Sequence, residues 1–108
     1  MERDKNIILI GMPASGKSTV GVILAKVLGK DFIDTDLVIQ QRENALLCEI
    51  QRTRGIPAFL KSEEEAVLSV SRKNAVIATG GSVVYSEAAM RYLAETGIIV
   101  YLKVEKNE

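Results

Sequence analysis

The sequence predicts an α/β protein in which a parallel sheet of four strands lies between helices in a three-layer arrangement. Short apolar runs alternate with segments of helical periodicity, in the order βαβαβαβ. The first apolar run leads into a glycine-rich turn and then a helix, as in parallel sheets whose ligands lie beyond the strand ends. We expect residues 1–108 to form a single domain.

The first half of the chain predicts two strands and three helical pieces. Residues 6–10, NIILI, are a continuous apolar run typical of a buried parallel strand. The next helix ends at Gly29 and carries apolar residues at the spacing of one face. These residues are Val20, Ile23, Leu24, Val27 and Leu28. A strand is expected over 31–35, and then a helix over 37–53 that is broken at Asn44.

The second half predicts two more helices and two more strands. A helix with Pro57 in its first turn runs to about Arg72. The run NAVIAT at 74–79 is the third strand. Ser86 is placed to cap the helix that follows, and residues 98–104 form the fourth strand.

The composition excludes several classes of function. The 14 basic and 14 acidic residues balance, which argues against a general basic surface for nucleic acid or anionic lipid. The absence of histidine excludes imidazole acid–base chemistry, and one cysteine cannot form an internal disulfide. The apolar run near the N-terminus is too short to cross a bilayer. We therefore expect a cytoplasmic protein with no nucleic-acid or membrane partner.

The stretch GMPASGKS at 11–18 matches the pattern G-x-x-x-x-G-K-[ST] of a phosphate-binding loop. Glycines let successive backbone N–H groups surround a phosphate, and the following helix N-terminus adds positive potential. Lys17 is predicted to bind the β- and γ-phosphates, and Ser18 to bind Mg²⁺ through its hydroxyl. The alternative is an ordinary glycine-rich turn with a surface lysine.

Two acids, Asp34 and Asp36, lie at the end of the second predicted strand. If both are extended, their side chains project to the same side, near the phosphate loop. A carboxylate there holds a Mg²⁺-bound water or accepts a proton from an attacking hydroxyl. The alternative is that Asp36 caps a helix and Asp34 is solvated.

The third predicted strand ends in the glycines Gly80 and Gly81 and carries no acid. Without that acid, and without an Asn-Lys-x-Asp element, the sequence does not favour a GTPase or a motor ATPase. The two glycines form either a simple tight turn or a substrate contact made by the backbone.

Taken together, several segments resemble the shikimate kinases, small P-loop kinases that phosphorylate a ring hydroxyl of shikimate with ATP. The segments are GMPASGKSTVG, FIDTD, GIPAFLKSEEEAVL, ATGGSVVYS and IIVYLKV, and they follow the family's order over essentially the whole chain. The resemblance implies a P-loop kinase fold, ATP and Mg²⁺ as cofactors, and a transferase of the shikimate pathway, which serves aromatic amino acid biosynthesis.

The resemblance also implies roles for individual residues. Asp34 positions magnesium through water, and Asp36 holds the substrate hydroxyls and acts as base. Gly81 offers its N–H to the substrate, with Gly80 in the same turn, and Glu63 steadies a substrate-binding arginine. The residues expected to bind the ATP phosphates are Gly11, Ala14, Ser15, Gly16, Lys17, Ser18 and Thr19.

The chain departs from the family pattern G-E-x-x-F-R-x-x-E, which here reads GIPAFLKSE. Ile56 replaces the glutamate, and Leu60 replaces the arginine that grips the shikimate carboxylate. A leucine cannot pair with a carboxylate. Lys61 is expected to point elsewhere on the helix, and Arg54 is the candidate substitute. Ser82 stands where the family has a third glycine.

The functional prediction is transfer of the ATP γ-phosphoryl group to a hydroxyl of shikimate or a related small molecule. Family members continue beyond the point matching Glu108 into an arginine-bearing lid and a further strand and helix, which we expect this domain to lack. Two alternatives stay open. One is a nucleotide-binding module without kinase activity, and the other is a kinase for a different hydroxylated metabolite. An exposed sheet edge predicts a monomer or weak self-association.

Overall fold

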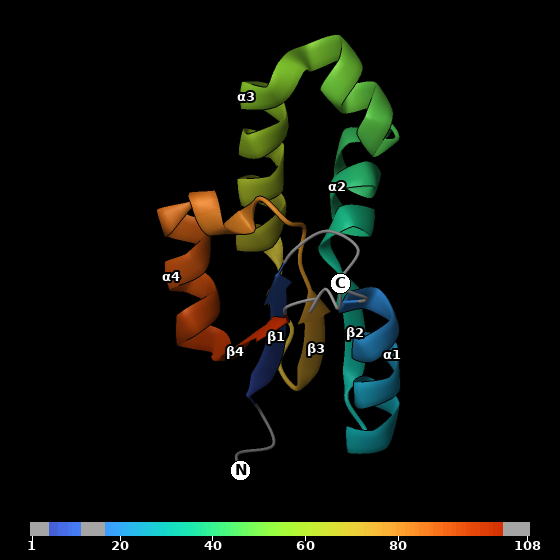
Figure 1. Ribbon diagram of the computed structural model, residues 1–108, viewed down its shortest axis with the longest axis vertical. Helices are drawn as coiled ribbons and strands as arrows, with labels where there is room; N and C mark the ends of the chain where they lie inside the picture. Colours follow the sequence, from blue (N-terminus) through green and yellow to red (C-terminus); the bar gives the residue numbers. More distant parts are fainter. Residues whose placement is uncertain (1–4, 12–16, 103–108) are drawn as a thin grey trace, which may run out of the picture.

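The computed structural model of the chain describes residues 5–11 and 17–102, and its strands form one parallel sheet. The strands are β1 (Asn6–Gly11), β2 (Asp31–Asp34), β3 (Ala75–Ala78) and β4 (Gly97–Leu102). Their order is β2-β3-β1-β4, so β1 is an inner strand and β4 is an outer one (Figure 1). The predicted four-stranded parallel sheet is confirmed.

Helices cover both faces of this sheet, as predicted. They are α1 (Lys17–Leu28), α2 (Thr35–Glu43), α3 (Leu47–Ser69) and α4 (Glu87–Thr96), with a 3-10 turn, η1 (Val83–Tyr85), before α4. Figure 1 shows α1 and α4 on opposite sides of the strands. It also shows α2 and the first part of α3 rising beyond the arrowheads, at the carboxyl ends of the strands.

Alternate residues of β1 enter two separate cores, because successive side chains of a strand point to opposite faces. Ile8 is fully buried against residues of α3 and α4. Leu9, which is 1% exposed, packs with Ala25 of α1. A third cluster joins α2 to α3 and contains Ile39, Ile50, Phe59 and Ala66. The helical extension at the carboxyl end of the sheet therefore has a core of its own.

The apolar face that the spacing predicts for α1 is wrong. Val20, Ile23 and Val27 are 42%, 59% and 75% exposed, whereas Ala25 is buried. A Cβ built on Gly21 would lie 2.6 Å from Phe32 Cε1, so this side of the helix lies directly on the sheet. Small residues allow that approach, and of the predicted large residues only Leu24 packs against this core.

The break between α2 and α3 is confirmed, whereas the alternative in which Asp36 caps α2 is wrong. Asp34 caps α2, because its Oδ1 accepts a hydrogen bond from the Asp36 N–H at 2.9 Å. Asn44 ends α2 in the left-handed region, with φ 52°. Gly55 interrupts α3 with φ 84°, and Pro57 lies in the first turn after it.

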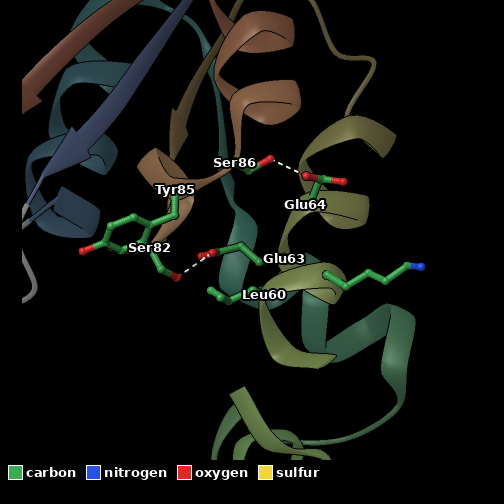
Figure 2. Close-up of a pocket in the computed structure, with 7 residues that line it drawn as sticks. Leu60, Glu63, Glu64, Ser82, Tyr85 and Ser86 are labelled. Atoms are coloured by element: carbon green, nitrogen blue, oxygen red, sulfur yellow. Dashed lines mark hydrogen bonds between the residues drawn. The ribbon is translucent and has the colours of Figure 1, made fainter. Parts of the chain in front are cut away.

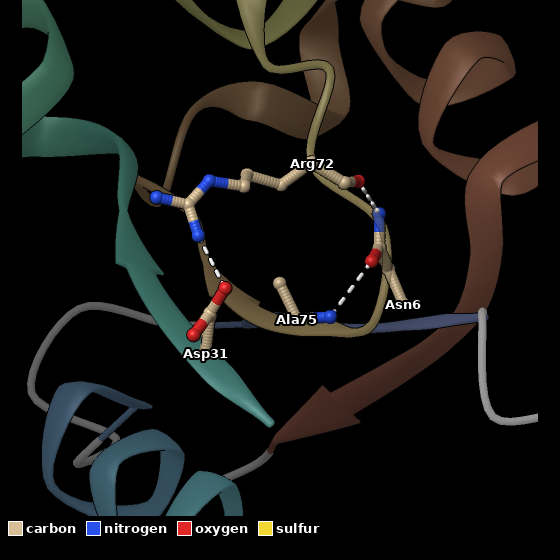
Figure 3. A network of polar contacts seen from close by, with 4 residues as sticks. All are labelled: Asn6, Asp31, Arg72 and Ala75. Atoms are coloured by element: carbon tan, nitrogen blue, oxygen red, sulfur yellow. Dashed lines mark hydrogen bonds and ion pairs between the residues drawn. The ribbon is translucent and has the colours of Figure 1, made fainter. Parts of the chain in front are cut away.

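A polar network fixes the opposite end of the sheet (Figure 3). Asn6 is 2% exposed, and its Nδ2 donates to the Arg72 carbonyl at 2.9 Å. Its Oδ1 accepts from the Ala75 N–H at 2.9 Å, and the Arg72 guanidinium pairs with Asp31. The amino ends of β1, β2 and β3 are thus tied together. No helix in the described part of the chain combines the length and apolar character needed to cross a bilayer.

Candidate functional site

The predicted phosphate loop connects β1 to α1 at the carboxyl end of the sheet. Gly11 ends β1 with φ 148°, and a Cβ on it would lie 2.1 Å from the Leu102 carbonyl oxygen. Glycine is therefore required here by the neighbouring strand. Thr19 is exposed in the first turns of α1. The predicted loop residues Ala14, Ser15 and Gly16, and the side chains of Lys17 and Ser18, lie outside the described part of the structure.

The two acids after β2 adopt different local structures. Asp34 is extended and caps α2, while Asp36 lies within the first turn of that helix. The condition that both acids are extended is therefore not met. Asp36 nevertheless faces the turn after β3, since its Oδ1 lies 3.1 Å from the position of a Cβ on Gly80.

Glu63 reaches the same turn from α3. It is 2% exposed, and its Oε1 accepts a hydrogen bond from Ser82 Oγ at 2.6 Å. A Cβ on Gly80 would lie 2.3 Å from Glu63 Oε2. The carboxyls of Glu63 and Asp36 therefore converge on Gly80, where only a residue without a side chain fits. Gly81 is exposed beside them.

Burial changes the acidity of Glu63. Desolvation raises the pKa of this carboxyl above its ordinary value of 4.5. The Ser82 hydrogen bond lowers the pKa and the nearby charge of Asp36 raises it, so the net shift is upward. Glu63 thus holds its proton more tightly than an exposed glutamate does.

A cavity of about 290 Å³ opens beside Glu63 (Figure 2). Its wall is formed by α3 and the turn that precedes α4, and includes Leu60, Glu63, Glu64, Ser82, Tyr85 and Ser86. Two serine–glutamate hydrogen bonds hold the walls together, Ser82 to Glu63 and Ser86 to Glu64. Ser86 also caps α4, as predicted, by accepting from the Ala89 N–H.

Sequence reasoning missed parts of this cavity. Lys61 lines it from an exposed position, although its place on the helix predicts another direction. Arg54, the candidate substitute for the missing arginine, pairs with Glu43 and is not among the described residues that line the cavity. Tyr85, at the rim, is 81% exposed. The sequence gives little indication that Ser82 contacts Glu63, because the two residues are 19 positions apart.

The donor set at this end of the sheet suits magnesium. Asp34 and Asp36 provide carboxylate oxygens, the ligands that Mg²⁺ prefers. No group of three or more His, Cys, Asp or Glu side chains in the described ranges is arranged to hold a metal by itself. Mg²⁺ keeps several waters and is commonly bound by one or two carboxylates together with substrate phosphates. The residues present therefore fit a magnesium–nucleotide complex better than a metal site made of protein ligands alone.

The chain is similar in sequence and in fold to proteins of one known family. The family model described as shikimate kinase matches residues 13–108. The chain is 42% identical over 104 residues to the shikimate kinase of Alkaliphilus oremlandii, and 37% identical over 99 residues to shikimate kinase 2 of Pectobacterium atrosepticum. The chain belongs to the shikimate kinase family. Among solved structures, the shikimate kinase from Acinetobacter baumannii in complex with shikimate superposes with a TM-score of 0.91 at 35% identity.

This member of the shikimate kinase family matches only part of its relatives. The matches cover 95% of this chain and 62% of the Alkaliphilus protein, and 92% of this chain and 57% of the Pectobacterium protein. For the Acinetobacter structure the shares are 96% and 59%. Two positions where the chain departs from the shikimate kinase pattern, Leu60 and Ser82, lie in the wall of the cavity.

Proposed function

We propose that this chain binds ATP with Mg²⁺ and transfers the γ-phosphoryl group to a hydroxyl of shikimate or a related small molecule. The nucleotide site is the loop from Gly11 to Thr19, and the acceptor site is the cavity between α3 and the turn after β3. Membership of the shikimate kinase family supports this reaction. So does the meeting of both regions at the carboxyl end of the sheet, where ligands of parallel sheets bind.

In this proposal each residue of the site has a separate role in the reaction. Asp36 accepts the proton of the acceptor hydroxyl, whose oxygen attacks the γ-phosphorus as the bond to the bridging oxygen breaks and ADP leaves. Lys17 provides positive charge for the β- and γ-phosphates, while Ser18 and Asp34 hold the metal side, Asp34 through water. Bound Mg²⁺ neutralises charge on the phosphates. Gly80 and Gly81 bring backbone close to the acceptor.

One observation carries the proposal. Asp36 Oδ1 and Glu63 Oε2 approach the same glycine from different helices, 3.1 Å and 2.3 Å from its Cβ position. Glu63 lines the cavity, and Asp36 reaches the glycine beside it, which supports a proton-accepting role for Asp36. Bringing two acids together is unfavourable because their charges repel each other, so their convergence supports a functional role.

The reaction is tested by following ADP formation and phosphorus NMR with ATP, Mg²⁺ and shikimate. We expect Asp36→Asn to lower kcat by about 10²- to 10⁴-fold, as is typical for loss of a general base. Nucleotide affinity, measured by calorimetry, should change less than about twofold, since an uncharged side chain of the same size is retained.

Asp31→Asn is the matched control, because Asp31 lies at the other end of β2 in an exposed pair with Arg72. It should leave kcat unchanged. Equal losses in both variants would contradict the role given to Asp36. Nucleotide binding without any acceptor-dependent turnover would instead favour the alternative of a binding module. The third possibility is a different hydroxylated acceptor, which Leu60 in the cavity wall leaves open. The same assay with other hydroxylated compounds tests it.

A further inference from the structure

A second cavity, of about 410 Å³, lies at the amino end of the sheet, and we call it the amino-end cavity. Its wall comes from the start of β1, the segment between α3 and β3, and the last turns of α4. Because the strands are parallel, this end of the sheet is opposite the end that carries the phosphate loop. The amino-end cavity is therefore separate from the candidate functional site.

Basic side chains outnumber acids around the amino-end cavity, although the chain as a whole has no net charge. Lys5, Arg72 and Lys73 line it, together with one acid, Glu95. The Lys30 ammonium lies close by, since it donates a hydrogen bond to the Lys5 carbonyl at 2.9 Å. The local excess of positive charge favours an anionic ligand.

Two of these cations have no ion-pair partner among the described residues. The Arg72 guanidinium pairs with Asp31 (Figure 3), whereas no described acid pairs with Lys5 or Lys73. Lysine binds phosphate as a compact point charge that does not require one fixed orientation. A phosphomonoester carries nearly two negative charges at neutral pH, which two ammonium groups can balance.

Tyr92 gives the amino-end cavity an aromatic wall. Its side chain is half-buried against the core that α4 covers, and its hydroxyl donates a hydrogen bond to the Val70 carbonyl. That hydrogen bond holds the ring in place before a ligand arrives, which lowers the entropic cost of binding. Asn6 uses both ends of its buried amide within the chain, so it offers no free polar group. An aromatic ring suits this part of the wall.

We propose that the amino-end cavity binds a small phosphomonoester that carries an aromatic ring. Lys5 and Lys73 hold the phosphate, and the ring of the ligand packs on Tyr92. Lys5 precedes β1, Lys73 precedes β3 and Tyr92 belongs to α4, so the ligand joins three elements that meet at this end of the sheet. This inference does not depend on the proposed function.

Calorimetry of the full chain with phenyl phosphate measures the binding, with Mg²⁺ and a saturating non-hydrolysable ATP analogue present to occupy the phosphate loop. We expect phenyl phosphate to bind about tenfold more tightly than phenol, which lacks the charge. It should bind about threefold more tightly than methyl phosphate, which lacks the ring. Added salt should weaken the binding, because both lysines are exposed. Equal affinities for phenyl phosphate and phenol would overturn the inference.

Two single variants identify the residues responsible. Lys5→Ala and Lys73→Ala should each lower the affinity for phenyl phosphate by about fivefold, since each removes one exposed charge. Lys26→Ala is the matched control. It removes the same charge from an exposed position in the last turn of α1, outside the lining of the amino-end cavity, and should change the affinity less than twofold. Thermal melting without ligand verifies the folding of each variant. Unchanged affinity in either folded cavity variant would overturn the inference.

Lys17→Ala separates the amino-end cavity from the predicted phosphate loop as the source of binding. The affinity for phenyl phosphate should stay within about twofold of the wild-type value, because Lys17 starts α1 at the other end of the sheet. A larger loss in Lys17→Ala than in Lys73→Ala would assign the phosphate to the loop and overturn the inference.

Discussion

At Gly80, the lack of a side chain allows two acids from different helices to approach each other. Glu63 contributes the buried member of this pair, and Asp36 the member at the start of α2. A single methyl group at position 80 would collide with Glu63 Oε2. The approach of the two acids thus depends on Gly80, whose missing side chain leaves room for them.

The raised pKa of Glu63 predicts a pH dependence of stability. Because the folded state holds this proton more tightly than the unfolded state, its stabilising contribution is complete below about pH 4.5 and is lost as the pH rises through the raised pKa. The free energy of unfolding of the wild type, relative to Glu63→Gln, should therefore fall as the pH increases from 4.5. Urea unfolding at a series of pH values measures this difference.

Glu64→Gln is the matched control for this prediction, because Glu64 is the neighbouring acid on α3. Like Glu63 it accepts a hydrogen bond from a serine, but its side chain is only half-buried. The difference between wild type and Glu64→Gln should show no comparable fall. Parallel curves for wild type and Glu63→Gln would contradict the raised pKa.

The acids of the site could be named from the sequence, but their contacts could not. Asp34, Asp36 and Glu63 follow from a recognisable order of motifs. The pairing of Glu63 with Ser82 depends on how α3 lies beside the turn after β3, and no local spacing encodes that. The sequence also does not show which aspartate caps α2, because this depends on where β2 ends, and it ends at Asp34.

Among the elements, α1 shows how side-chain size decides which face of a helix is buried. Large apolar residues and small residues each follow a helical spacing in this segment, and periodicity alone does not choose between them. The helix approaches the sheet through Gly21 and Ala25, because only small residues fit against Phe32. The four strands and the break at Asn44 are predicted correctly, because each depends on residues that are close together in the sequence.

This packing predicts opposite effects of two substitutions in α1. Gly21→Ala should destabilise the chain by roughly 1 kcal/mol, because the overpacking cost of about 1–3 kcal/mol exceeds the gain in helix propensity. Val27→Ala should change stability by less than about 0.5 kcal/mol, because Val27 is 75% exposed. Urea unfolding of both variants measures the two effects. A larger loss for Val27→Ala than for Gly21→Ala would mean that the other face is buried.

At the scale of the whole molecule, β4 is an outer strand of the sheet that the described residues form. Its exposed apolar side chains include Ile98, Val100 and Tyr101, and the strand contains no charged residue. Such edges pair with other strands when nothing blocks them. The position of β4 therefore supports the weak self-association that an exposed sheet edge predicts from the sequence.

We expect the chain to self-associate weakly, with sedimentation coefficients that rise with concentration. Val100→Lys should reduce this rise, because a lysine on an edge strand opposes pairing. Val84→Lys, at a similarly exposed position in η1, is the control and should leave the association unchanged. Ideal monomeric sedimentation of the wild type at every concentration would contradict the expectation.

Gly11 at the end of β1 lies directly against the main chain of Leu102 at the end of β4. Gly11 is the first residue of the loop proposed to hold the nucleotide, and Leu102 belongs to β4, an outer strand. A partner strand bound along β4 would therefore contact main chain next to the start of the proposed nucleotide loop. We expect such binding to change nucleotide affinity, which calorimetry at low and high chain concentration would measure.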